Sequence, residues 1–175
     1  VVETGLQEKN EYATNMIRFI DEQMAHITDS LMHFRVEIDD YKLGHRDLLG
    51  GSNYVLERLN ELDRQKAELE LANRYYDYLS RYIRQNRTEE VFAPNLIGLE
   101  APLLDGFVEN YIDRKMEDRV AMNERNEKNP LVQREDDRMD RLEENIFENI
   151  SELKEANQEL IDELDRKSNF YLSSV

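Results

Sequence analysis

The sequence predicts an all-α protein: an elongated antiparallel coiled coil or helical bundle of about four helices, with residues 1–175 forming a single arm. Three observations predict this class. Apolar residues recur at alternating steps of three and four between Ile17 and Tyr41, only 6 Gly and 3 Pro interrupt the 175 residues, and charged residues make up 35% of the chain. A 3.5-residue repeat keeps one apolar stripe against a partner helix, and few turn-forming residues are typical of long helices.

The first predicted helix covers about residues 7–42. Its apolar residues follow one another without a missing step and are here called the N-terminal ladder: Ile17, Ile20, Met24, Ile27, Leu31, Phe34, Ile38 and Tyr41. Gly44, Gly50 and Gly51 come next and interrupt helical structure, and Ser52 or Asn53 can cap the helix that follows.

The second predicted helix covers about residues 53–86. Its apolar stripe contains one charged member, and two successive three-residue steps around Leu69 shift the stripe and overwind a coiled coil locally. The stripe consists of Val55, Leu59, Leu62, Lys66, Leu69, Ala72, Tyr76, Leu79 and Ile83.

Residues 88–101 show no helical pattern, which predicts an ordered loop that packs Phe92, Leu96 and Ile97 against the helices. The third predicted helix covers about residues 102–125 and begins at Pro102, where the missing N–H group is tolerated. Its inner side is formed by Leu104, Val108, Tyr111, Lys115 and Met122.

The fourth predicted helix is the longest and covers about residues 130–171. Asn129 is biased away from helical torsions by the following proline, and Pro130 can open the helix. The stripe of this helix consists of Val132, Met139, Leu142, Ile146, Ile150, Leu153, Leu160 and Leu164.

A set of stripe residues is expected to hold the architecture together, because burying each one contributes about 1.5–3 kcal/mol. These residues are Ile17, Ile20, Ile27, Leu31, Phe34, Leu59, Leu62, Leu69, Leu142, Ile146, Leu153 and Leu160.

The overall charge limits the classes of partner. The chain carries 23 Lys and Arg against 39 Asp and Glu, a net charge of −16, so phosphate backbones and anionic lipids would repel it. There is no Cys for a disulfide framework or a thiolate nucleophile, and no apolar run long enough to span a bilayer. The start lacks a signal peptide and an initiator Met, and we expect the chain to be a piece of a longer protein.

Catalytic and metal-binding patterns are absent from the sequence. His26 and His33 lie seven residues apart among acidic residues, but they fall outside the apolar stripe and lack the i, i+4 spacing of zinc-binding helices. No nucleophile elbow, phosphate-binding loop or catalytic triad occurs, and the many carboxylates are expected to be solvated. The sequence therefore predicts no catalytic, cofactor-binding or metal residue, no cofactor and no enzymatic activity.

The stretch from Arg74 to Arg87 combines aromatic and basic residues. Tyrosine rings such as Tyr78 stack on sugars, and Arg74, Arg81 and Arg84 could pair with the acidic groups of a polysaccharide. The alternative, which we favour, is that Tyr76 and Leu79 belong to the apolar stripe and the arginines offset acidic neighbours.

Five stretches of the sequence are similar to one protein family, the bacterial polysaccharide co-polymerases or chain-length determinants of the Wzc/GumC type. The resemblance runs from about Gln7 to Asp165, although the loop at 43–53 has no counterpart in the family. The stretches are RFIDEQMAHITDSL (Arg18–Leu31), LNELDRQKAELELANRYYDYLSRY (Leu59–Tyr82), FAPNLIGLEAPLL (Phe92–Leu104), RNEKNPLV (Arg125–Val132) and NISELKEANQELIDELD (Asn149–Asp165).

The resemblance implies that the chain is the extracytoplasmic helical region of an inner-membrane protein, located in the periplasm. Family members form rings and take part in the length control, assembly and export of capsular polysaccharide and exopolysaccharide. Implied partners are sister subunits and an outer-membrane polysaccharide export protein. Many members carry a separate tyrosine-kinase domain, whose Walker motifs are absent here.

The function expected from the sequence is therefore that of a non-catalytic coiled-coil module of a polysaccharide co-polymerase. The alternative is a soluble cytoplasmic coiled-coil scaffold. Sequencing the parent gene distinguishes the two, since only the first requires a membrane span on each side of this region.

Overall fold

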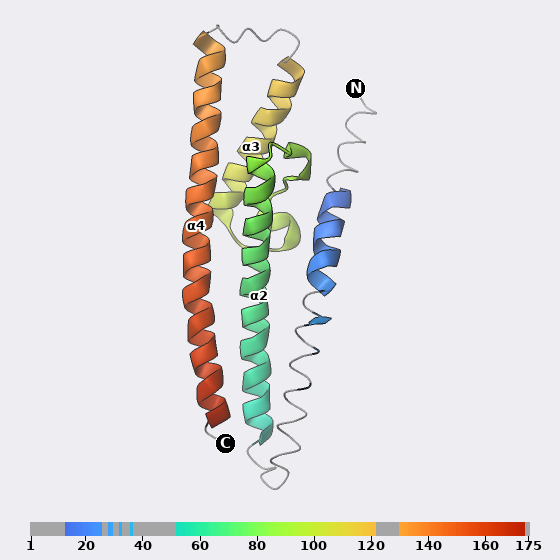
Figure 1. The fold of residues 1–175 in the computed structure, drawn as a ribbon, viewed down its shortest axis with the longest axis vertical. Coiled ribbons are helices and arrows are strands. Elements are labelled where there is room, and N and C mark those ends of the chain that lie inside the picture. The colour runs from blue at the N-terminus through green and yellow to red at the C-terminus, as the bar shows by residue number, and fades with distance from the viewer. Residues whose placement is uncertain are drawn as a thin grey trace. The chain divides into compact units, whose positions relative to one another are not determined.

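The computed structural model describes residues 13–25, 28–29, 32, 36, 52–121 and 130–173. Every regular element in these residues is helical, which confirms the predicted all-α class. After a helical segment at 13–25 come α2 (Ser52–Arg84), the short 3₁₀ helices η1 (Thr88–Glu90) and η2 (Pro94–Ile97), α3 (Pro102–Ala121) and α4 (Pro130–Ser173) (Figure 1).

The chain divides into two compact units. Unit 1 contains Val1–Arg18 and Arg74–Lys154, and unit 2 contains Phe19–Asn73 and Glu155–Val175. Helices α2 and α4 each contribute one part to each unit, and each unit has its own packing.

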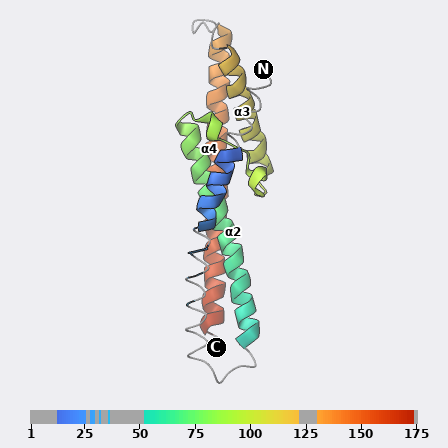
Figure 2. The ribbon, with the colours of Figure 1, turned by 90° about the vertical axis from the view of Figure 1, so that its right-hand side faces the viewer.

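In unit 2, residues 52–73 of α2 and 155–173 of α4 lie side by side (Figures 1 and 2). The Lys66 Nζ atom lies 2.6 Å from Asp165 Oδ1, and the Asn157 side-chain amide donates to Asn73 Oδ1 at 2.9 Å. Residue numbers rise along α2 as they fall along α4, so the pairing is antiparallel, as predicted. The ion pair also explains how the apolar stripe of α2 accommodates a lysine. Leu59, Ala72, Ile161 and Leu164 are buried.

The predicted burial of one stripe residue of α4 is wrong. Leu160 is 48% exposed, and its neighbour Ile161 is buried instead. The prediction continued the seven-residue repeat from Leu153 to Leu160, but Asn157 takes a position in the interface through its hydrogen bond to Asn73. Two successive four-residue steps, from Leu153 through Asn157 to Ile161, then shift the buried stripe by one residue.

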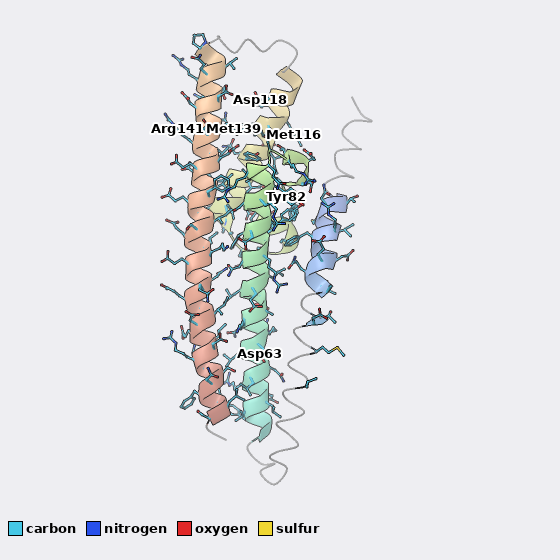
Figure 3. All side chains as sticks on the ribbon, viewed as in Figure 1. Asp63, Tyr82, Met116, Asp118, Met139 and Arg141 are labelled. Carbon is cyan, nitrogen blue, oxygen red and sulfur yellow. The ribbon has the colours of Figure 1, made fainter. Side chains whose placement is uncertain are left out.

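In unit 1, α3 lies beside the first half of α4 and runs in the opposite direction (Figures 1 and 2). Arg114 Nη1 joins α3 to Glu135 Oε2 of α4 at 2.9 Å. Figure 3 labels Met139, which is buried, and Arg141, two positions further on, which is exposed. The core of this unit includes Leu79, Ile83, Leu104, Val108, Tyr111, Leu142, Ile146 and Ile150, as the stripes predicted.

The helical segment at 13–25 does not pack through the N-terminal ladder. Ile17, Ile20 and Met24 are 55%, 39% and 58% exposed, whereas Phe19, outside the ladder, is 2% exposed. The predicted burial of Ile17 and Ile20 is therefore wrong in this chain. Asn15 and Arg18 bond to Glu89 and Glu90 and fix which side of the helix turns inward. The ladder members Ile27, Leu31, Phe34, Ile38 and Tyr41 lie outside the described residues.

The observed boundaries differ from the predicted ones by a few residues. Helix α2 ends two residues early because Asn86 has a φ of 55°, in the left-handed region that ends a helix. Helix α4 ends at Ser173, two residues late. The expected end of α3 near 125, Met122 and Asn129 lie outside the described residues.

The predicted loop at 88–101 contains two short 3₁₀ helices. Phe92 is 1% exposed, as expected, but Leu96 is 59% exposed, so its predicted packing is wrong. Gly98 caps the end of the second 3₁₀ helix with a φ of 77°, in the left-handed region that glycine adopts readily. The backbone N–H of Asn95, next to Leu96, donates to Asp105 Oδ1 at 2.8 Å and thereby holds this turn to the start of α3 with polar atoms.

Candidate functional site

The aromatic residues of α2 form a cluster around the loop that follows the helix. Tyr75, Tyr76 and Tyr78 are 0%, 4% and 9% exposed. The ring centroids of Tyr75 and Tyr78 each lie 5.4 Å from that of Phe92. The centroid of Tyr82 (labelled in Figure 3) lies 4.5 Å from that of Tyr78. These distances are those of favourable aromatic pairs in a protein core.

Two tyrosine hydroxyls tie α2 to the backbone of this loop. Tyr75 donates to the carbonyl oxygen of Phe92 at 2.5 Å, and Tyr78 donates to that of Glu90 at 2.6 Å. Burial, assisted by the negative charge of Asp105, raises the pKa of Tyr75 well above its usual value. Burial also raises the pKa of Tyr78 to about 12. Both phenols are therefore kept neutral as hydrogen-bond donors.

The side chain of Glu90 is buried and lies between two arginines. Its carboxylate oxygens pair with Arg18 at 2.9 Å and with Arg87. The Asn15 side chain donates to the carbonyl oxygen of Glu89 at 3.1 Å. A buried carboxylate requires such charge-assisted partners, and these contacts bind residues 13–18 to the rest of unit 1.

The other arginines of the stretch differ in their surroundings. Arg84 lies over the ring of Phe147, with 4.8 Å between Cζ and the ring centroid, and Arg87 lies over Tyr82 at the same distance. Arg81 is exposed and Arg74 is half-buried. Since Tyr78 is buried, its ring is not available to stack on a sugar. Tyr76 and Leu79 are buried, as the alternative interpretation expects, and we do not retain the acidic-polysaccharide site at Arg74, Arg81, Arg84 and Tyr78.

Sequence reasoning missed Tyr75, Tyr78 and Glu90 as buried residues. A signal was present, because Tyr75, Tyr78 and Tyr82 form a second stripe beside the one that contains Tyr76 and Leu79. Two adjacent stripes indicate a helix that packs on two sides. No such pattern marks Glu90, whose burial depends on arginines 72 and 3 residues away in the sequence.

Helix α4 borders an open pocket of about 550 Å³ in unit 1, which is lined by Asp140, Glu143, Glu144, Phe147 and Glu148. Lys115 Nζ lies 3.6 Å from Glu143 Oε1, and Arg84 covers the Phe147 ring. The pocket is open, and its lining consists of four carboxylates and one aromatic ring.

No group of three or more His, Cys, Asp or Glu side chains within the described residues is arranged to hold a metal ion. His26 and His33 lie outside those residues. In the same part of the chain, no helix combines the length and apolar character needed to cross a membrane.

Comparison with known proteins adds no relative to this picture. No family model, no curated protein and no solved structure matches the chain.

Proposed function

We propose that this chain is a non-catalytic helical module that acts by presenting contact surfaces to other proteins. The observation that carries the proposal is the outward position of the N-terminal ladder. Ile17, Ile20 and Met24 are exposed on a helix whose other side is held by Asn15 and Arg18. Three large apolar side chains at positions i, i+3 and i+7 form the kind of stripe that another helix covers.

The setting that we propose is the extracytoplasmic region of a polysaccharide co-polymerase, on the periplasmic side of the inner membrane. The support for this setting is the resemblance of the five sequence stretches to that family. In such an assembly the exposed ladder would contact a helix of a sister subunit or of an export protein. The module would then influence polymer length through the spacing of subunits.

The test is made in the parent gene, in the bacterium that carries it. The double variant Ile20→Ser/Met24→Ser removes apolar contact area at exposed positions, so the helical melting curve of the isolated chain should not change. The length distribution of the exported polysaccharide should shift on a gel. The control, Asp21→Ser/Ala25→Ser, changes two exposed residues of the same helix outside the ladder and should leave polymer length unchanged.

Two outcomes contradict the proposal. An unaltered polymer length in the ladder variant would exclude the ladder as the functional surface. A parent gene without a membrane span on each side of this region would instead favour the cytoplasmic scaffold.

A further inference from the structure

The outer face of α3 has an unusual composition. Leu103 is 59% exposed, Gly106 and Asn110 are exposed, and Phe107 is half-buried. Gly106 and Phe107 follow Leu103 by three and four positions and Asn110 follows it by seven, so all four share one side of the helix. We call them the outer face of α3. The inner side of the same helix, which includes Leu104 and Val108, is fully buried.

Gly106 is not required by the packing of the chain itself. It lies inside a regular helix, and a Cβ atom built on it would have no atom within 4 Å. Glycine in a helix interior loses more backbone entropy on folding than alanine, and no described contact compensates for this loss. A bare backbone position next to Leu103 and Phe107 lets another helix approach α3 closely, since interaxial distance depends on the side chains at the contact.

The charge around this face selects the type of partner. Residues 88–113 contain six Asp and Glu and no Lys or Arg; five of the six remain to charge the surface, because Glu90 is buried and pairs with Arg18 and Arg87. Glu109 and Asp113 are exposed and follow Gly106 by three and seven positions. Arg114 lies at this face and donates to Asn110 Oδ1 at 2.8 Å, but its charge is offset by Glu135 at 2.9 Å, and that of Lys115 is offset by Glu143 at 3.6 Å. This surface attracts a cationic partner, and it repels a second copy of a chain whose net charge is −16.

We propose that the outer face of α3 docks an amphipathic helix of a partner protein that carries Lys and Arg beside an aliphatic anchor. The anchor packs over Gly106 between Leu103 and Phe107, and the basic side chains pair with Glu109 and Asp113. This is recognition of a helix by an apolar strip with a charged rim. It does not depend on the polysaccharide setting or on the N-terminal ladder.

The probe for the test is a synthetic peptide of about 18 residues, long enough to fold as a helix, with leucines at i, i+3, i+4 and i+7 and lysines elsewhere. Binding to the whole chain is measured by fluorescence anisotropy at about 0.15 M salt, where long-range attraction is screened. Gly106→Gln fills the bare position with a good helix former. It should weaken binding about tenfold or more while the melting temperature stays the same or rises.

Matched variants separate the docking surface from general acidity. Glu109→Gln/Asp113→Asn should weaken binding, whereas Glu152→Gln/Glu155→Gln, which removes the same charge from exposed positions of α4, should not. Ile20→Ser/Met24→Ser should bind the peptide as the wild type does. The docking inference and the proposed function of the N-terminal ladder can therefore fail independently of each other. A peptide of the same composition with its leucines scattered around the helix should bind weakly.

Three results would overturn the inference. The first is equal peptide binding by the wild type and Gly106→Gln. The second is equal weakening by the two charge-removing variants. The third is sedimentation of the wild type as a dimer that Gly106→Gln dissociates, because the occupant of the face would then be a second copy of the chain.

Discussion

The hydrogen bond from Tyr75 to the Phe92 carbonyl gives a sharp test of how the loop is held to α2. Tyr75→Phe removes one oxygen atom and keeps the ring, so the aromatic packing stays intact. Both residues are essentially inaccessible to water, and the carbonyl oxygen therefore loses a donor that water does not replace. Removing a buried intramolecular hydrogen bond costs about 0.5–1.5 kcal/mol.

For a chain of this length, a loss of about 1 kcal/mol lowers the melting temperature by roughly 2–4 °C. Thermal unfolding followed by circular dichroism measures this shift. Tyr82→Phe is the matched control, since it removes the same atom from a half-buried residue of the same helix and should change stability by less than about 0.5 kcal/mol. If Tyr75→Phe and Tyr82→Phe unfold at the same temperature, the hydroxyl of Tyr75 does not hold the loop and the reasoning is wrong.

Three further predictions concern other parts of the fold. Ile161→Ala should destabilise the protein by about 2–4 kcal/mol in urea unfolding, and Leu160→Ala by less than about 1 kcal/mol, since only Ile161 is buried. A larger loss of stability in Leu160→Ala than in Ile161→Ala would instead support the stripe that the sequence predicted. Burial and the nearby charge of Glu143 raise the pKa of Tyr111 from 10.0 to about 12, so the folded chain holds this proton more tightly than the unfolded chain does. The contribution of Tyr111 to stability should be constant below about pH 10 and should fall by about 2–3 kcal/mol up to about pH 12. Tyr75 and Tyr78 add to the total fall, so a pH series of urea melts measures the part due to Tyr111 as the difference between the wild type and Tyr111→Phe, and equal falls in the two proteins would contradict this. Glu90→Gln should cost about 1–2 kcal/mol and increase hydrogen exchange in residues 13–18, whereas Glu100→Gln, at an exposed position, should do neither; unchanged exchange in the first variant would show that its arginine pairs do not anchor the segment.

Much of the fold follows from periodicity. The stripes of the second and third predicted helices identified Leu59, Leu79, Ile83, Leu104 and Val108, all of which are buried. Residues three and four apart share a side of any helix, whatever surrounds it, so these members could be named before their partners were known. The antiparallel arrangement of the helices was likewise predicted from apolar stripes, but the pairing of α2 with α4 in unit 2 was not.

The candidate site was much less predictable. Tyr78 was considered as a sugar-stacking residue, and Glu90 was not considered at all, yet both are buried. The burial of Glu90 depends on Arg18, whose position 72 residues earlier leaves no local pattern in the sequence. The bare position at Gly106 also has meaning only once its surroundings are known, because a glycine in a helix is equally compatible with a crowded crossing and with open space.

The amino-acid sequence by itself determined that this protein is helical, which residues share each side of a helix, and that its surface is strongly acidic. Tertiary structure alone decided which of those sides is covered. It placed Ile17 and Ile20 in solvent and Phe19 in the interior, and it replaced Leu160 by Ile161 at the position where Asn157 meets Asn73. The physical reason is that local spacing fixes the angle between side chains around one helix axis, whereas the rotation of that helix is set by contacts with residues far away in the chain.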